Sequence, residues 1–356
     1  MTVAWIGNRD AQVPLAIEQA AALLVKSRCP VITLDTDVEA TRAALALARR
    51  IGAVCDQLSD GVAHETALFT ASGGIFLAPS EALRRADVVL IVGELPPSSL
   101  PFLEQLATTE PDLSGGKPRT IFTLSAGDVP DAVAKVARHL AVQDVSIAAA
   151  VAVLHSAYAV RPTAVSIDGF EQLGAALAKA RFVGVVCSGH GCDALALEML
   201  QGLVGDLNQS TRASMLLWPA SERGWGSVLV STWSTGFPLP VSFLSGDAEY
   251  DPRRFLARRM IEEGEADVWL HVGSPPDDIP VGVELVVVAP VSAPVDGAAV
   301  TIVVAEPGVE HDTVLFSGLA GTFLARAAEA SGQLQSASVV LNQMLKQLPQ
   351  HEAMPC

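Results

Sequence analysis

Residues 52–74, GAVCDQLSDGVAHETALFTASGG, are the first stretch of the chain whose side chains could do chemistry together. They include Asp56, Asp60, His64 and Glu65. Carboxylates near an imidazole can transfer protons or bind a metal ion. The segment starts in an apolar run and ends in small residues with a glycine pair, a pattern that predicts a loop. Two interpretations stay open here: an active-site loop, and a loop of that shape with nothing left to react.

A second candidate is the stretch CSGHGC, which places Cys187, His190 and Cys192 within six residues, after an apolar run. Zinc binds cysteine and histidine, but a structural site needs a fourth ligand, and the neighbouring sequence offers none. We interpret Cys187 as a small buried hydrophobic residue and His190 as a turn residue. Gly189 and Gly191 form a G-x-G pattern that lacks the third glycine of a dinucleotide-binding loop.

Other patterns that could carry chemistry are incomplete. The stretch SGGKPR at 114–119 resembles a phosphate loop, but Pro118 stands where that loop needs a serine or threonine. No G-x-S-x-G nucleophile motif occurs. The remaining histidines are isolated, and we expect His139 and His155 to lie on helix surfaces.

Residues 218–255 are the most distinctive part of the sequence. They contain three of the five tryptophans, several glycines and prolines, and little periodicity. We expect a long loop, which in a compact α/β chain is usually functional or part of an interface. A plug in the core between two domains is the alternative.

Strand-type and helix-type patterns alternate along the rest of the chain. The run PVITL (30–34) predicts a strand, and the next stretch predicts a helix with Asp37 as its N-cap and Gly52 at its end. Further buried strands are expected within 84–97, 119–125 and 181–191. This alternation is typical of βαβ units and parallel sheets.

One stretch recurs within the chain: ADVVLIVGELPP (86–97) is similar to ADVWLHVGSPPD (266–277). The similarity suggests two Rossmann-like halves, although any two buried strands can resemble each other by chance. Ligands of open parallel sheets bind at the carboxyl ends of the strands. A site is therefore expected at the turns GELPP, CSGHG and GSPPD.

The composition limits the possible partners. Of 356 residues, 50% are hydrophobic and 5% aromatic, and the net charge is −16. The surplus of apolar residues predicts a large interface, as in an obligate oligomer or a member of a larger complex. The negative charge argues against nucleic-acid binding. No stretch is long enough for a membrane span or resembles a secretory signal. With five scattered cysteines, we expect a cytoplasmic protein with reduced thiols.

Six stretches resemble, in the same order, the B subunit of formylmethanofuran dehydrogenase, a short member of the molybdopterin oxidoreductase superfamily. They read DTDVEATRAALALARRIGAVCD, DGVAHETAL, EALRRADVVLIVGELPPSSLP, STWSTGFPLPVSFLSGDAEYDP, GEADVWLHVGSPP and GVEHDTVLFS. The resemblance covers nearly the whole chain, and residues 233–252 are its most specific part.

The resemblance implies an α/β fold of two Rossmann-like domains, with mainly parallel sheets covered by helices. These would be like the central domains of molybdopterin oxidoreductases, without their N-terminal iron–sulfur domain. It also implies a discontinuous first domain of residues 1–65 and 215–356, and a second domain of residues 66–214.

The chain departs from this family where the family's redox centres are held. The family begins with cysteines that bind a four-iron cluster, whereas here no cysteine precedes Cys29. Its molybdenum or tungsten ligand is a cysteine or selenocysteine just before a histidine, and here that stretch reads Val-Ala63-His64-Glu. A methyl group cannot coordinate a metal, so we expect no metal–pterin and no iron–sulfur cluster. The vestigial candidates for cofactor contacts are Gly189, Gly191, Trp233 and Gly236.

Such a degenerate B subunit is what the formyltransferase/hydrolase complexes of methylotrophic bacteria contain. The resemblance implies three partners: the A subunit, which is similar to zinc amidohydrolases, the C subunit, and the D subunit, which is the formyltransferase. These partners would act on a methanofuran-type formyl carrier in tetrahydromethanopterin-linked conversion of formaldehyde to formate. This chain is then expected to be a non-catalytic scaffold.

Two alternatives remain beside the scaffold. The loops CSGHG and ERGWGS could bind a nucleotide or a methanofuran-type cofactor and line a formyl tunnel. Alternatively, His64 could bind the metal in a redox-active chain.

Overall fold

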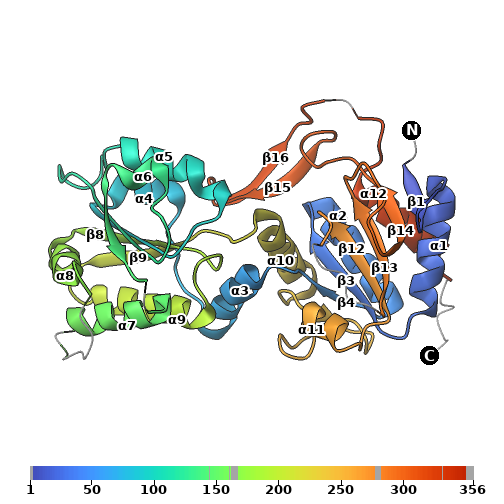
Figure 1. Ribbon diagram of the computed structural model, residues 1–356, viewed down its shortest axis with the longest axis horizontal. Helices are drawn as coiled ribbons and strands as arrows, with labels where there is room; N and C mark the ends of the chain where they lie inside the picture. The colour runs from blue at the N-terminus through green and yellow to red at the C-terminus, as the bar shows by residue number, and fades with distance from the viewer. Residues whose placement is uncertain are drawn as a thin grey trace. The chain divides into compact units, whose positions relative to one another are not determined.

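The computed structural model describes residues 3–143, 145–159, 161, 167–276, 282–330 and 332–349 (Figure 1). Asp277 of the repeated stretch and Cys356 lie outside these residues. The chain divides into two units. Unit 1 comprises Met1–Leu58, Arg223–Phe316 and Phe323–Cys356, and unit 2 comprises Ser59–Glu222 and Ser317–Thr322. The domain boundaries expected after residue 65 and before residue 215 fall within helix α3 (Asp60–Ser72) and strand β9 (Arg212–Leu217), and both elements belong wholly to unit 2.

Unit 1 is built on a nine-stranded sheet of order β11-β10-β4-β3-β12-β13-β14-β1-β2. Its five central strands, from β4 to β14, are parallel, and the strands beyond them on both sides pair antiparallel. The strands of the unit are β1 (Ala4–Ile6), β2 (Arg9–Asp10), β3 (Pro30–Asp35), β4 (Val54–Asp56), β10 (Val241–Ser242), β11 (Glu249–Tyr250), β12 (Val268–Gly273), β13 (Glu284–Ala289), β14 (Ala298–Val303), β15 (Thr313–Ser317) and β16 (Thr322–Arg326). Its helices are α1 (Val13–Lys26), α2 (Val38–Ile51), α10 (Glu222–Thr235), α11 (Ala257–Glu262) and α12 (Ala337–Gln347).

Helices cover both faces of this sheet because its central strands are apolar on both sides. Alternate residues of neighbouring strands, such as Val31, Trp269 and Val287, pack against helix α11 in one hydrophobic cluster. Helices α1, α2 and α12 lie side by side, with α12 between the other two (Figure 1). The strand predicted at 30–34 and the caps of the next helix are confirmed: the Asp37 side chain accepts from Ala40 N, and Gly52 ends α2 with a left-handed φ of 67°.

Unit 2 is built on a five-stranded sheet of order β7-β6-β5-β8-β9, in which all neighbours are parallel. Its strands are β5 (Val88–Val92), β6 (Thr120–Ser125), β7 (Ala137–Ala141), β8 (Phe182–Cys187) and β9. Its helices are α3, α4 (Pro79–Arg85), η1 (Pro97–Ser99), α5 (Leu100–Thr108), α6 (Asp131–Ala134), α7 (Ile147–Tyr158), α8 (Phe170–Lys179) and α9 (Ala194–Leu207).

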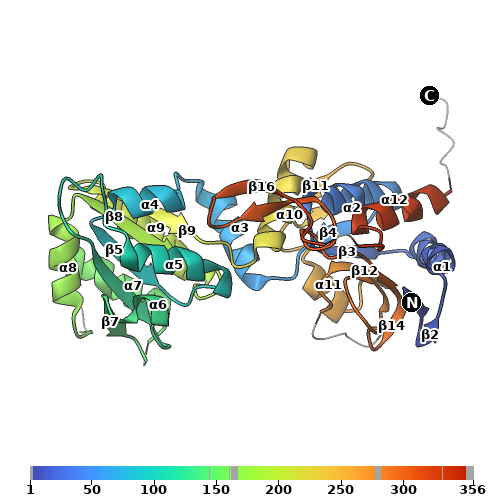
Figure 2. The same cartoon turned by 90° about the horizontal axis from the view of Figure 1, so that it is seen from above.

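The two faces of the unit 2 sheet have separate hydrophobic cores. In the run VVLIV of β5, Val88, Leu90 and Val92 belong to the cluster formed with α7, α8 and α9, whereas Val89 and Ile91 belong to the cluster formed with α4 and α5. Figure 1 shows these two sets of helices on opposite faces of the sheet, and Figure 2 views the sheet from the side of α4 and α5. The expected α/β class with parallel sheets covered by helices is therefore confirmed. The two copies of the repeated stretch form β5 and β12, one buried parallel strand in each sheet.

Three expectations about local structure are wrong. Residues 52–74 contain strand β4 and helix α3 rather than a loop; Ser59 caps the helix, and its residues Val62, Glu65, Thr66 and Leu68 are buried. Part of the long loop expected at 218–255 is helix α10, in which Gly224 and Gly226 are buried. His139 lies on strand β7, where its Nδ1 pairs with Thr123 Oγ1 at 3.0 Å, whereas His155 lies on helix α7 as expected.

Within the described ranges, no helix is both long and apolar enough to cross a bilayer.

Candidate functional site

Helix α3 carries Ala63, the position at which the resemblance implies a metal ligand. The helix begins after Ser59, whose hydroxyl accepts from Val62 N at 3.3 Å, so Ala63 and His64 lie in its first turn and a half. Both residues are half-buried. Asp56 does not join them: it lies on β4 of unit 1, where its carboxylate accepts from Gln57 N and Ala257 N, each at 2.8 Å. The structure therefore does not assemble the four side chains of residues 52–74 into one constellation.

Glu65 uses its carboxyl group to tie α3 to the carboxyl ends of two strands. The side chain is fully buried, and its Oε1 accepts from Gly189 N at 2.8 Å and Ala220 N at 2.9 Å, with Ser188 Oγ at 3.4 Å. Burial raises the pKa of Glu65 to about 8, against the opposing effect of these hydrogen bonds. A carboxyl group that already holds two backbone amides is a structural joint, and sequence inspection missed it.

Gly189 and Gly191 are needed for close approach of backbones. A Cβ on Gly189 would lie 2.0 Å from the carbonyl oxygen of Gly61, and one on Gly191 would lie 2.2 Å from Glu94 N. The turn after β8 is thus pressed against α3 on one side and against the turn after β5 on the other. This packing explains both glycines without a cofactor. Cofactor contacts by them stay a prediction.

Two buried atoms at this joint have no partner within the described residues: His64 Nδ1 and Glu65 Oε2. They belong to consecutive residues next to Ala63. An imidazole and a protonated carboxyl do not replace a thiolate, which is the ligand that the resemblance implies. The donor set of this segment therefore does not fit the family's metal.

The cysteines of the CSGHGC stretch are buried thiols. Burial raises the pKa of both Cys187 and Cys192, and Cys192 Sγ points at the carbonyl oxygen of Val92 at 3.5 Å. A thiol held protonated by burial is a poor metal ligand. Across the described part of the chain, no group of three or more His, Cys, Asp or Glu side chains is placed to hold a metal ion.

In unit 1, the side chain of Asp37 lies at the carboxyl end of strand β3. Asp37 follows β3, and its Oδ1 caps α2 through Ala40 N at 2.7 Å. Its Oδ2 accepts from Thr313 Oγ1 at 2.8 Å and pairs with His311 Nε2 at 3.2 Å. The amino end of a helix after a strand is where Rossmann-like folds bind phosphate, and here a buried anion already occupies it. The sequence indicated the cap but not its two distant partners.

Trp233 and Gly236 belong to unit 1, whereas Ala63, His64, Gly189 and Gly191 belong to unit 2. Trp233 lies on α10, is 56% exposed and meets Phe323 edge-on with 5.1 Å between ring centroids. Gly236 follows the helix with φ 86°, and its N–H donates to Thr232 O. Both residues thus have local structural roles, and their contacts to a cofactor stay a prediction.

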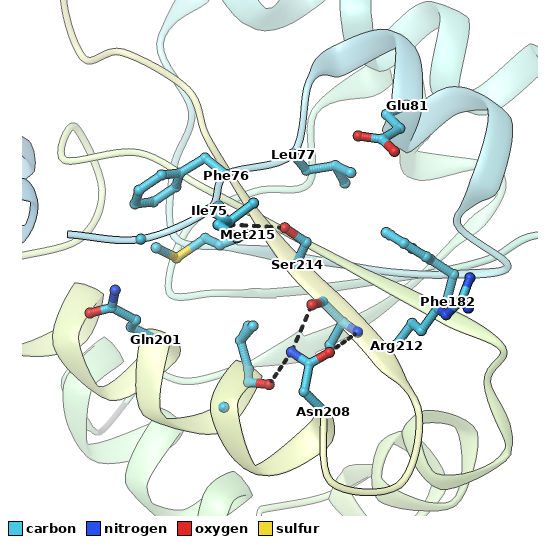
Figure 3. Close-up of a pocket in the computed structure, with 14 residues that line it drawn as sticks. Ile75, Phe76, Leu77, Glu81, Phe182, Gln201, Asn208, Arg212, Ser214 and Met215 are labelled. Atoms are coloured by element: carbon cyan, nitrogen blue, oxygen red, sulfur yellow. Dashed lines mark hydrogen bonds between the residues drawn. The ribbon is translucent and has the colours of Figure 1, made fainter. Parts of the chain in front are cut away.

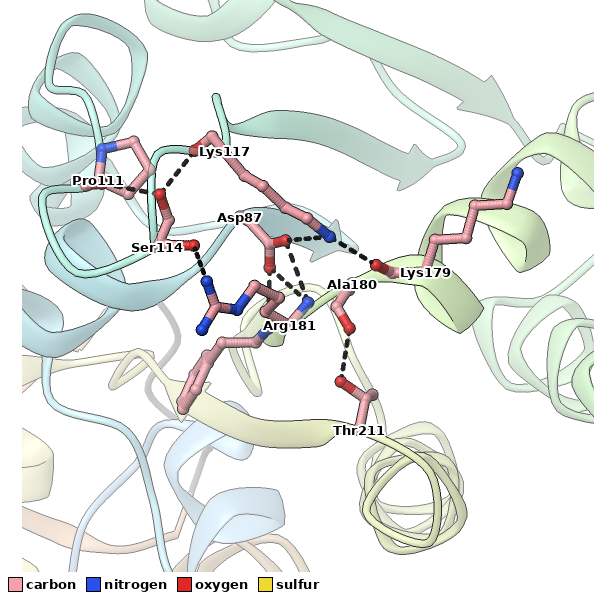
Figure 4. Close-up of polar contacts among 9 residues, drawn as sticks. Asp87, Pro111, Ser114, Lys117, Lys179, Ala180, Arg181 and Thr211 are labelled. Carbon is pink, nitrogen blue, oxygen red and sulfur yellow. Dashed lines mark hydrogen bonds and ion pairs between the residues drawn. The ribbon is translucent and has the colours of Figure 1, made fainter.

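The SGGKPR stretch lies at the amino end of the unit 2 sheet, the end opposite to the strand ends near Glu65, and its side chains bind other protein groups there (Figure 4). Asp87 accepts from the backbone N–H groups of Arg181 and Phe182 and pairs with Lys117 Nζ at 3.7 Å. Lys117 also donates to Lys179 O, and Ser114 Oγ donates to Lys117 O. The lysine is bound to protein groups, which agrees with the rejection of a phosphate loop.

Comparison with known proteins gives two curated relatives. The chain is 33% identical over 277 residues to the B subunit of the formyltransferase/hydrolase complex Fhc of Methylorubrum extorquens, covering 77% of this chain and 75% of the relative. It is 25% identical over 287 residues to the B subunit of the tungsten-containing formylmethanofuran dehydrogenase 2 of Methanocaldococcus jannaschii, covering 73% of this chain and 64% of that one. No family model matches the chain.

The fold has a solved counterpart. The structure matches a chain of the crystal structure of the formyltransferase/hydrolase complex (FhcABCD) from Methylorubrum extorquens in complex with methylofuran. The TM-score is 0.86 and the identity 29%, and the match covers 97% of this chain and 98% of that one. Sequence and fold agree: the chain belongs to the family of B subunits of the formyltransferase/hydrolase complex.

Proposed function

We propose that this chain is the B subunit of a formyltransferase/hydrolase complex and serves there as a structural component without a redox centre. The observation that carries the proposal is Ala63. In the resemblance to formylmethanofuran dehydrogenase, this position holds the thiolate or selenolate that binds tungsten or molybdenum, and a methyl group has no lone pair to offer.

The surroundings of Ala63 support the loss of that chemistry. Two residues before it, Gly61 packs against Gly189, and two residues after it, Glu65 binds the backbone of Gly189 and Ala220. These contacts hold the turn after β8 on helix α3. In this proposal, Ala63 therefore lies in a segment that packs against the turn after β8 and binds its backbone.

In this proposal the chemistry belongs to the partner chains. Formyl transfer and hydrolysis of the formylated carrier are assigned to the formyltransferase-like D subunit and the zinc-dependent A subunit, with the C subunit as a further partner. The carrier is a methanofuran-type molecule, and the complex works in the cytoplasm. The large share of apolar residues, 50% of the chain, fits a protein part of whose surface is covered by partners.

Metal analysis of the co-purified complex tests the proposal. We expect zinc that stays with the other subunits, and less than one-tenth equivalent of tungsten, molybdenum or iron per copy of this chain. The control is a preparation of the same complex that lacks only this chain. Stoichiometric tungsten, molybdenum or non-haem iron that disappears in that preparation would overturn the scaffold role.

One observation favours a second function, the binding of a small molecule at the strand ends of unit 2. His64 Nδ1 and Glu65 Oε2 are buried polar atoms without a partner in the described chain, and such atoms are uncommon. A methanofuran-type carrier or a nucleotide that binds there should protect a His64→Cys variant from a thiol reagent. Equal labelling with and without the carrier would remove this alternative. If His64 instead held a redox metal, formylmethanofuran-dependent dye reduction would be lost in His64→Ala.

A further inference from the structure

A groove of about 580 Å³ runs along the free edge of the unit 2 sheet (Figure 3). Strand β9 is the edge strand, helix α9 forms one wall through Val204 and Gly205, and the segment from Ile75 to Leu77 forms another. The groove lies outside the strand-end joint around Glu65. Nothing in the comparisons assigns it a role.

The backbone at this edge is already satisfied. Phe76 forms a parallel bridge with Met215, and Leu77 N donates to Met215 O at 2.8 Å. Further along β9, the amide side chain of Asn208 accepts from Ala213 N at 3.0 Å and donates to Ala213 O at 2.8 Å (Figure 3). An occupant would therefore not add a strand to this sheet. It would meet side chains.

Those side chains combine apolar surface with one free cation. Ile75 is 94% exposed, and Val204, Leu77 and Met215 lie in the same lining. Arg212 is exposed at the start of β9 and has no acidic partner within the described residues. An exposed isoleucine with neighbouring apolar residues is typical of a surface that another protein covers.

The lining has no free acid for Arg212. Its one carboxylate, Glu81, is paired with Arg85 at 3.1 Å on helix α4. Within the described residues, no carboxylate of this lining neutralises the exposed Arg212 guanidinium. The complementary ligand is thus an apolar group that carries a carboxylate next to it.

We infer that this groove is the docking site of another subunit of the complex. A segment of that subunit would insert one large apolar side chain between Ile75 and Gly205 and would place a neighbouring Asp, Glu or C-terminal carboxylate on Arg212. The inference rests on the proposed function, because it needs a partner subunit. It adds the surface and the chemistry of recognition.

Two pairs of variants test the groove in the assembled complex. A Cβ on Gly205 would meet nothing within 4 Å, so a side chain can start there: Gly205→Leu extends it into the groove, and Gly205→Ala is its control. Arg212→Glu reverses the charge, and Arg138→Glu makes the same change on β7, the opposite edge strand of the same sheet. We expect at least tenfold weaker assembly for Gly205→Leu and Arg212→Glu on dilution of the purified complex, with both controls close to wild type.

Folding of the variants is measured on the full-length chain by circular dichroism. If Gly205→Leu unfolds the chain, the surface change Arg212→Glu still decides the question. Assembly unchanged in Arg212→Glu would overturn the inference. Equal weakening by Arg138→Glu would also overturn it, since it would indicate a general charge effect.

A photoreactive amino acid at position 75 identifies the occupant. We expect a crosslink to one co-purifying subunit, at an apolar residue within two positions of a carboxylate. A crosslink only to a second copy of this chain, or none, would contradict the inference. Failure of wild-type chain to co-purify with any other subunit would instead contradict the proposed function, so the two failures are distinguishable.

Discussion

Gly61 and Gly189 meet backbone to backbone: a Cβ atom added to Gly189 would lie 2.0 Å from the carbonyl oxygen of Gly61. Glu65, one turn further along helix α3, binds the N–H of the same Gly189. Ala63 lies between these two anchors in the sequence. The segment around Ala63 is therefore held in place by contacts between protein groups.

The contact between Gly61 and Gly189 predicts that Gly189→Ala lowers the stability of the chain, whereas the same substitution at Gly205 does not. Gly189→Ala forces backbone apart and should lower the free energy of unfolding by about 2 kcal/mol, as overpacked sites do. Gly205→Ala, in the last turn of α9 with open space around its Cα, should raise it by up to about 0.5 kcal/mol through helix propensity. Urea denaturation followed by circular dichroism measures both. Equal stability of the two variants would mean that the turn after β8 can move away from α3.

The hydrogen bonds of Glu65 predict that the stability of the chain depends on an acceptor oxygen at position 65 more than on a negative charge there. Glu65→Ala leaves the N–H groups of Gly189 and Ala220 without their acceptor and should cost about 3 kcal/mol, at ~1–3 kcal/mol for each buried unpaired group. Glu65→Gln keeps an acceptor oxygen and should cost less than about 1 kcal/mol at pH 7, since the carboxyl group with its pKa of about 8 is mostly protonated there. The same urea titrations distinguish the two. A glutamine variant as unstable as the alanine variant would contradict a neutral Glu65.

The fold could be predicted from the sequence where the pattern is local. Strands such as β3 and β5 are continuous apolar runs, and the caps of α2 are single residues of the preferred type. The hydrogen bonds from Gly189 N and Ala220 N to Glu65 could not be predicted in this way, because Glu65 lies 124 and 155 residues from these partners in the chain. Helix α10 was missed since its glycines and tryptophans have weak helix propensity and only tertiary packing selects the helix.

Two buried carboxyl groups predict that stability falls as the pH rises. Burial raises the pKa of Glu65 to about 8 and that of Asp56 to about 7, from the ordinary values of 4.5 and 3.8 that apply in the unfolded chain. Between these values the folded chain keeps protons that the unfolded chain has released, so the stabilisation present below pH 4 is lost toward pH 8. Each proton contributes a slope of about 1.4 kcal/mol per pH unit.

Urea midpoints at pH 5, 6, 7 and 8 measure this slope. Glu65→Gln should remove most of the slope between pH 7 and 8, because Glu65 holds more of the remaining protons there than Asp56 does. Stability that increases over this range would contradict the raised pKa values of both carboxyl groups, and a slope unchanged in Glu65→Gln would contradict that of Glu65.

Replacing Asp37 should lower the free energy of unfolding by more than the loss of an ordinary helix cap does. Asp37→Ala removes the acceptor for Ala40 N and also the partner of Thr313 Oγ1 and His311 Nε2. The loss of a cap costs about 1 kcal/mol, and the buried threonine hydroxyl adds about 1 kcal/mol or more when it is left unpaired. The matched control is Ser146→Ala on α7, where only the cap to Ala149 N is lost, for about 1 kcal/mol or less. Thermal unfolding compares the two variants. A Thr313→Val change in the Asp37→Ala background should then restore part of the loss, because no hydroxyl remains unpaired; no recovery would mean that Thr313 finds another acceptor.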